Sequence, residues 1–178
     1  MMRPVHSRFL PALLLTTLVA GVHLPAQAEL FGLFGDSANK PAWKEGDVPT
    51  PPAFSLDRLI EVETSAASSL RSGIDPSTIS IGADGVVRYV AVARNDTATN
   101  ISYEGIRCNA AEHRVYARYY EGEGWKPADG EWHALVSNRA APHARALARG
   151  GICVGAAPNT SPAQIARDLR NPPLYQTP

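Results

Sequence analysis

The sequence predicts an α+β domain: a twisted antiparallel sheet of five or six strands with one or two C-terminal helices and one disulfide. Three observations lead to this prediction. Short β-rich runs separated by turn residues fill positions 59–136, helical composition is confined to positions 140–170, and the chain contains two cysteines. Strands first and helices last are typical of α+β proteins, and closely spaced sequential strands favour antiparallel pairing.

The first 28 residues have the layout of a secretory signal peptide. Arg3 and Arg8 form a short basic region, residues 9–22 are uncharged and mostly apolar, and Ala26-Gln27-Ala28 offers small residues for cleavage after position 28. The apolar run is short for a membrane span. We therefore expect an exported protein that is not an integral membrane protein.

The rest of the chain fits one domain with a preceding arm. Residues 29–55 are proline-rich, with prolines at positions 41, 49, 51 and 52, which favours an extended arm. Trp43 and Phe54 are predicted to dock this arm on the core, the alternative being a flexible spacer whose Trp43 awaits a partner. Residues 56–170 are expected to form the single α+β domain, and residues 171–178 a loose tail.

Turn residues divide the first half of the domain into strands. Residues 59–63 alternate, and Ile74-Asp75-Pro76 indicates a turn. Residues 78–81 and 86–94 flank Ala83-Asp84-Gly85, and Asp-Gly between β-rich runs is a strong hairpin signal. Residues 86–93 are apolar at both alternating sets of positions, which predicts a central strand.

The second half continues the sheet and then becomes helical. Residues 100–109 and 112–120 are the next predicted strands, and residues 131–136 return after a glycine-rich hairpin tip. A helix is expected over 140–149, stopped by Gly150-Gly151, and another over 163–170, with Ser161 as its N-cap.

Cys108 and Cys153 are expected to form a disulfide, because exported proteins pass through an oxidising compartment. The bond would close a loop of about 45 residues and contribute on the order of 4 kcal/mol of stability. The alternative is two buried free thiols. A redox pair is disfavoured because the chain lacks Cys-x-x-Cys spacing.

Charge and motifs exclude several function classes. The chain has 17 Lys+Arg and 17 Asp+Glu, so no basic excess is available for nucleic acid. Neither His-x-x-x-His nor Glu-x-x-His occurs, and the expected hairpin register places His113 about 16 Å from His133, at roughly 3.3 Å per residue. His143 is expected in the first helix. We therefore predict no metal site and no cofactor, and the chain has no Gly-x-Ser-x-Gly nucleophile motif.

A polar cluster falls in the predicted strands. Its members are Arg88, Tyr103, Glu104, Arg107, Tyr116 and Arg118. Alternation places Glu104 on the face of Cys108, toward the core, where a buried carboxylate needs a partner. Arg88 on a neighbouring strand is the predicted partner. The cluster is then either a structural ion pair beside a Tyr/Arg-covered outer face, or a ligand groove lined by aromatic and arginine side chains.

Several sequence blocks form a recognisable set. They are Asp84–Tyr89, Tyr103–Cys108, Tyr116-Ala117, Trp125, Trp132 and Cys153, preceded by Pro41–Glu45. Together they resemble the cryptic neisserial protein family of Gram-negative bacteria, over roughly residues 43–153. The resemblance implies an exported, periplasmic protein. It implies no activity and transfers no catalytic residue.

These observations lead us to expect a non-catalytic binding or protein-interaction module, whose partner is an unknown periplasmic protein or envelope component. The alternative is a small periplasmic hydrolase using carboxylates such as Glu104 or Asp84. A deep pocket with a raised-pKa carboxylate would favour the enzyme, and a flat aromatic face or an open edge strand would favour binding. Glycosylation triplets at Asn95, Asn100 and Asn159 allow a secreted eukaryotic module, which the resemblance disfavours.

Overall fold

A computed structural model describes residues 42–64, 69–136 and 141–172. From Trp43 onward, the described residues form one compact unit. The predicted signal peptide, the start of the arm and the end of the tail lie outside the described residues. None of the helices within the described ranges is long and apolar enough to cross a membrane.

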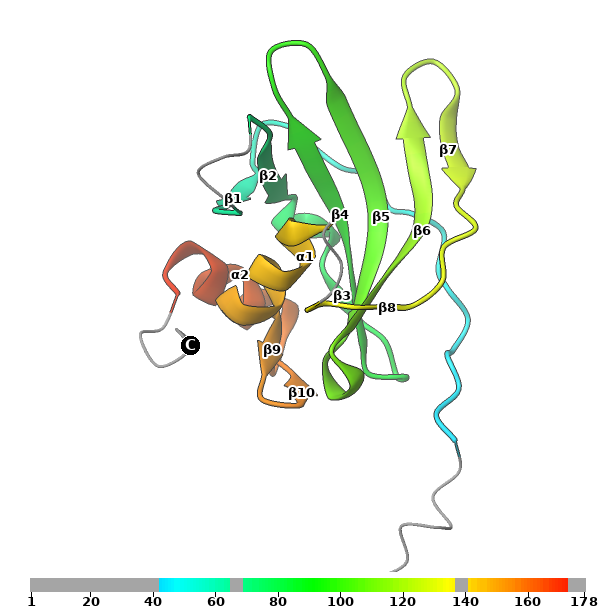
Figure 1. The fold of residues 1–178 in the computed structure, drawn as a ribbon, viewed down its shortest axis with the longest axis vertical. Helices are drawn as coiled ribbons and strands as arrows, with labels where there is room; N and C mark the ends of the chain where they lie inside the picture. Colours follow the sequence, from blue (N-terminus) through cyan, green and yellow to red (C-terminus); the bar gives the residue numbers. More distant parts are fainter. Residues whose placement is uncertain (1–41, 65–68, 137–140, 173–178) are drawn as a thin grey trace, which may run out of the picture. The chain divides into compact units, whose positions relative to one another are not determined.

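The core of the fold is an antiparallel sheet of eight strands (Figure 1). In chain order these are β1 (Ile60–Val62), β2 (Arg71–Ile74), β3 (Ser80–Ile81), β4 (Val86–Arg94), β5 (Thr99–Arg107), β6 (Glu112–Tyr120), β7 (Gly124–Pro127) and β8 (His133–Ala134). The main path runs β1-β2-β4-β5-β6-β7, while β3 pairs with β4 and β8 pairs with β6. The predicted count of five or six strands is therefore too low, although the antiparallel α+β class is confirmed.

The β3–β4 hairpin forms where Asp84-Gly85 predicted it. Gly85 adopts a φ of 77°, a left-handed conformation that glycine adopts without steric cost. β4 then runs through the middle of the sheet, and its residues from Val86 to Val92 are all buried. The predicted central strand is confirmed.

The helices come last, as predicted. α1 (Pro142–Leu147) continues into a π-helical turn, η5 (Ala148–Ile152), in which Gly151 has a φ of 152°. A small hairpin of β9 (Cys153–Val154) and β10 (Ala157–Pro158) follows. α2 (Pro162–Arg170) begins after Ser161, whose hydroxyl accepts a hydrogen bond from the Gln164 amide at 3.1 Å.

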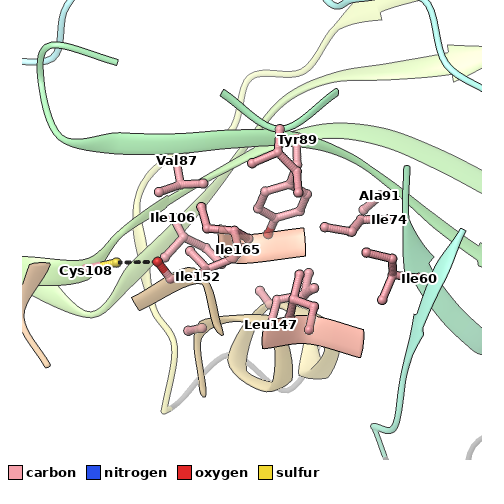
Figure 2. Packing of buried hydrophobic residues seen from close by; sticks show 14 of the residues in the cluster. Ile60, Ile74, Val87, Tyr89, Ala91, Ile106, Cys108, Leu147, Ile152 and Ile165 are labelled. Carbon is pink, nitrogen blue, oxygen red and sulfur yellow. Dashed lines mark hydrogen bonds between the residues drawn. The ribbon is translucent and has the colours of Figure 1, made fainter. Parts of the chain in front are cut away.

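Each face of the sheet carries its own apolar cluster. On the inner face, side chains of the sheet such as Tyr89 and Ile106 point toward Leu147, Ile152 and Ile165 of the helical segment (Figure 2). The cluster on the outer face is smaller and contains five buried residues: Val90, Val92, Ile101, Tyr103 and Ala117.

The N-terminal arm docks on the outer face. Phe54 contacts the rings of Tyr119 and Trp125 with centroid distances of 5.1 Å and 5.7 Å. Trp43 packs edge-on against Trp132 at 5.9 Å. The docking predicted for Trp43 and Phe54 is confirmed, and the spacer alternative is wrong for this segment.

The disulfide joins the two layers. Cys108 follows directly after β5, and Cys153 begins β9 after the helical segment, with an S–S distance of 1.99 Å. The predicted bond between sheet and helix is confirmed. It fixes the helical layer against the inner face, where the candidate site lies.

Candidate functional site

The predicted polar cluster is divided between the two faces of the sheet. In the register of β4 and β5, Tyr89 is opposite Glu104 and Arg88 is opposite Gly105. Directly opposed residues project to the same face, so Glu104 and Arg88 lie on different faces. The predicted Glu104–Arg88 ion pair is therefore wrong, although the inward orientation of Glu104 is confirmed.

Arg88 pairs with carboxylates on the outer face instead. Its Nη2 donates to Asp84 Oδ2 at 2.6 Å and lies 3.4 Å from Glu45 Oε1. The arginine is only 2% exposed, so this charge is neutralised inside the protein. Burial tends to raise the pKa of Asp84, but hydrogen bonds from Arg88 and from two backbone amides outweigh burial and lower it.

On the outer face, Glu45 of the arm lies among a group of side chains that we call the outer-face cluster: Arg88, Arg107, Arg114, Tyr116 and Trp132. The Glu45 carboxylate accepts hydrogen bonds from Arg114 Nη1 at 2.7 Å, Tyr116 Oη at 2.5 Å and Trp132 Nε1 at 3.2 Å. The guanidinium of Arg107 lies 3.9 Å from the ring centroid of Trp43. The chain's own arm thus covers the aromatic and arginine side chains that the sequence suggested for a ligand.

The inner face holds a different group, which we call the Glu104 cluster: Glu104, His113 and His143. Glu104 Oε2 lies 2.9 Å from Nε2 of each histidine. Ser102 donates to Oε1 at 2.5 Å and Tyr89 donates to Oε2 at 3.3 Å. Glu104 and His113 are each 2% exposed, whereas the side chain of His143 is 15% exposed.

Three elements bring this cluster together. Glu104 lies in β5, and His113 lies in β6 opposite Ile106, so alternation puts both side chains on the inner face. A β-bulge beside Glu104 leaves Tyr116 as the extra residue of β6. His143 is the second residue of α1, and the position of this helix over the sheet brings it to Glu104.

The electrostatics of the cluster favour an ionised carboxylate. Burial tends to raise the pKa of Glu104, but the charge of His143 and hydrogen bonds from both histidines outweigh it and hold that pKa far below its usual range. Burial tends to lower the pKa of His143, and the charge of Glu104 reverses this, so that its pKa is raised. Burial and the same negative charge raise the pKa of Tyr89, which keeps its hydroxyl as a donor.

A cleft of about 760 Å³ opens over the Glu104 cluster. Ser102, Glu104, His113 and Arg118 line it from β5 and β6, and His143 lines it from α1. Arg118 is the one other member of the predicted polar cluster that faces this cleft. Tyr103, Arg107 and Tyr116 belong to the outer face, so the structure brings the six predicted residues to two separate sites.

His133 also lines the cleft, and its position corrects the sequence-based register. β8 pairs with the start of β6, so that His133 is directly opposite His113. The predicted separation of about 16 Å assumed one continuous return strand. In the structure β7 pairs with the C-terminal end of β6, at residues 117–120. The chain after Pro127 then runs back along β6, and β8 pairs with the N-terminal end of β6, at Glu112 and His113.

The sequence analysis missed the convergence of His113 and His143 on Glu104. These histidines are 9 and 39 residues from Glu104, so no short spacing motif marks them. The position of His113 follows from strand alternation across a tight β5–β6 connection. The position of His143 depends on the placement of α1, for which the sequence gives no local signal.

Comparison with known families identifies a family for most of the chain. The model of the CNP1-like family matches residues 38–170. This range includes residues 43–153, the stretch whose sequence resembles the cryptic neisserial protein family, and all three residues of the Glu104 cluster. No curated protein and no solved structure matches the chain.

Proposed function

The chain belongs to the CNP1-like family, an uncharacterised family, and we propose that it is an exported domain that binds a small molecule in the cleft above the Glu104 cluster. The observation that carries this proposal is a cleft of about 760 Å³ lined by the buried carboxylate of Glu104, which contacts two histidines. Export is supported by the signal-peptide layout of residues 1–28 and by the disulfide.

The properties of the cleft are those of a small-molecule site. Such sites have volumes of roughly 300–1,000 Å³ and combine apolar walls with a few convergent polar groups of perturbed pKa. Here Ala91 and Pro142 contribute apolar surface, while Glu104 and His143 supply the polar groups. A ligand in the cleft would therefore meet a fixed negative charge beside a histidine of raised pKa.

The outer-face cluster is a weaker candidate for the binding site. Glu45 already accepts hydrogen bonds from three of its side chains, and Trp43 covers Arg107. A ligand there would have to displace the arm and replace each of these contacts. The inner cleft requires no such displacement among the described residues.

A hydrolase is the second candidate, because the carboxylate of Glu104 lines a pocket. General acid–base catalysis needs a pKa near the working pH, and that of Glu104 is held far below it, so Glu104 suits the role of a charge stabiliser or a metal ligand. Asp84 belongs to the outer face, where it pairs with Arg88. Asp84 therefore has no place in a reaction at the cleft.

Blocking the cleft tests the proposal. Ala93 is half-buried on the cleft wall, so Ala93→Phe places a ring inside, whereas Ala98→Phe adds the same ring at an exposed turn. We expect native mass spectrometry, after incubation with the small-molecule fraction of a periplasmic extract, to detect a bound species on the wild type and Ala98→Phe but not on Ala93→Phe. Equal retention by all three proteins, or no bound species on the wild type, would contradict a ligand in the cleft.

A further inference from the structure

We infer that Glu104, His113 and His143 form a binding site for a divalent transition-metal ion of the zinc type at the floor of the cleft. This inference rests on the proposed function, because it names one ligand of the same cleft. The first support is the donor set. Two imidazoles and one carboxylate are ligands that Zn²⁺ and related ions accept, as in the His₂Glu sites of metalloenzymes.

The donor atoms already lie close to the arrangement that a metal requires. One ligand atom from each residue lies within 4.8 Å of the other two, and both histidine Nε2 atoms lie 2.9 Å from Glu104 Oε2. Around a tetrahedral ion with bonds of about 2.0–2.2 Å, neighbouring ligand atoms are roughly 3.3–3.6 Å apart, a few tenths of an ångström more than the separations here. Small side-chain rotations are therefore enough to admit the ion.

The surroundings hold the carboxylate in place. Ser102 donates to Oε1 and Tyr89 donates to Oε2, and such hydrogen bonds orient a metal-binding carboxylate and fix its position. Glu104 and His113 come from paired strands of the sheet, so their backbone positions are rigid relative to each other. This is the kind of support that a preorganised metal site needs.

The number of ligands indicates an open site. Structural zinc sites are closed by four protein ligands, whereas three protein ligands leave a coordination position for water or another molecule. His143 is the partly exposed member and lines the cleft, so the open position faces the cleft. The ion would then take part directly in binding the small molecule, through an oxygen, nitrogen or sulfur donor of that molecule.

His133, the one histidine of the predicted mature chain outside the proposed site, provides a matched control. His133 lines the same cleft and lies opposite His113, but its ring nitrogens are not among the three clustered donors. Replacing it removes a cleft imidazole while leaving the proposed ligands intact. His143 is the ligand to replace first, because its side chain is the partly exposed one of the three.

The test is calorimetric titration of the chelator-treated, disulfide-bonded protein with Zn²⁺, repeated with Co²⁺ while visible absorption is recorded. We expect one bound ion per chain and a Co²⁺ spectrum of a low-coordinate N/O site. His143→Ala and Glu104→Gln should each weaken Zn²⁺ binding by about 100-fold or more, and His133→Ala should leave it unchanged. Circular dichroism establishes that each variant is folded.

Two results would overturn the inference: no stoichiometric binding by the wild type, or equal affinity in the wild type and His143→Ala. If Zn²⁺ fails to bind but Ala93→Phe still loses its bound molecule, the metal inference fails and the proposed function stands. If Zn²⁺ binds as expected while no small molecule is retained, the metal site stands and the proposed small-molecule function fails.

Discussion

Replacement of Glu104 by glutamine should strongly destabilise the metal-free protein. The Glu104 side chain is buried, and its carboxylate lies within hydrogen-bond distance of four side chains, two of them histidines that point at the same oxygen. Glutamine keeps the volume and one oxygen but loses the charge. Its amide also brings two N–H donors into a site that already contains donors.

The size of the effect follows from these contacts. A hydrogen bond to a charged group contributes about 1.5–3 kcal/mol, and breaking a buried charge pair costs about 3–5 kcal/mol. A glutamine oxygen in the place of Oε2 keeps three of the four contacts as uncharged hydrogen bonds, but the charge that pairs with the histidines is lost. We therefore expect a loss at the lower end of this range, roughly 3 kcal/mol in the free energy of unfolding. Urea unfolding followed by tryptophan fluorescence, in buffer containing a chelator, measures this loss.

The pH of the assay follows from the direction of each pKa shift. The lowered pKa of Glu104 contributes stability above its ordinary value of 4.5, and this contribution is lost as pH falls through the folded-state pKa. The raised pKa of His143 contributes stability below its ordinary value of 6.5, and this contribution is lost as pH rises through the folded-state pKa. Both contributions are therefore present between pH 4.5 and 6.5, where the assay belongs.

Glu112→Gln is the matched control. Glu112 forms an ion pair with Arg107, but its side chain is 26% exposed, so its loss should cost less than about 1 kcal/mol. If Glu104→Gln costs no more than Glu112→Gln within the pH window, the buried carboxylate does not organise the inner face, and the reasoning is refuted.

Three further predictions concern the rest of the chain. Cys153→Ala should lower the free energy of unfolding by about 2–5 kcal/mol, and equal melting temperatures for this variant and the oxidised wild type would count against a stabilising role of the disulfide. Glu45→Ala should speed tryptic cleavage after the exposed Lys44, because Arg114, Tyr116 and Trp132 no longer hold the arm; an unchanged cleavage rate would show that Glu45 does not anchor it. N-terminal sequencing of the exported protein should begin at Glu29, and recovery of intact Met1 from the periplasm would exclude cleavage there.

Much of the fold was predictable because its signals are local. The Asp84-Gly85 turn, the apolar run of β4 and the Ser161 cap each act within a few residues. The strand count was too low because β2 and β7 were not predicted: each has four residues, and Gly73 in β2 and Gly124 and Pro127 in β7 are turn residues that hide any alternation. Their pairing is set by neighbouring strands rather than by their own sequence.

The candidate site was predictable only in part. Alternation from Cys108 places Glu104 on the inner face, and the structure confirms this. Alternation within β5 does not identify the partner of Glu104, because the partner depends on the register between β4 and β5. This register places Tyr89 opposite Glu104 and puts Arg88 on the other face. The position of His143 depends on how α1 packs over the sheet. Packing between segments that are distant in the sequence is not marked by a short motif.

A crystal structure of the protein grown with Zn²⁺, with anomalous data collected at the zinc absorption edge, tests the metal site in the cleft most directly. We expect one strong anomalous peak about 2.0–2.2 Å from Nε2 of His113, Nε2 of His143 and a carboxylate oxygen of Glu104. A peak held by His133 without these three donors, or an inner face in which both histidines still contact Glu104 with no peak between them, would contradict the site.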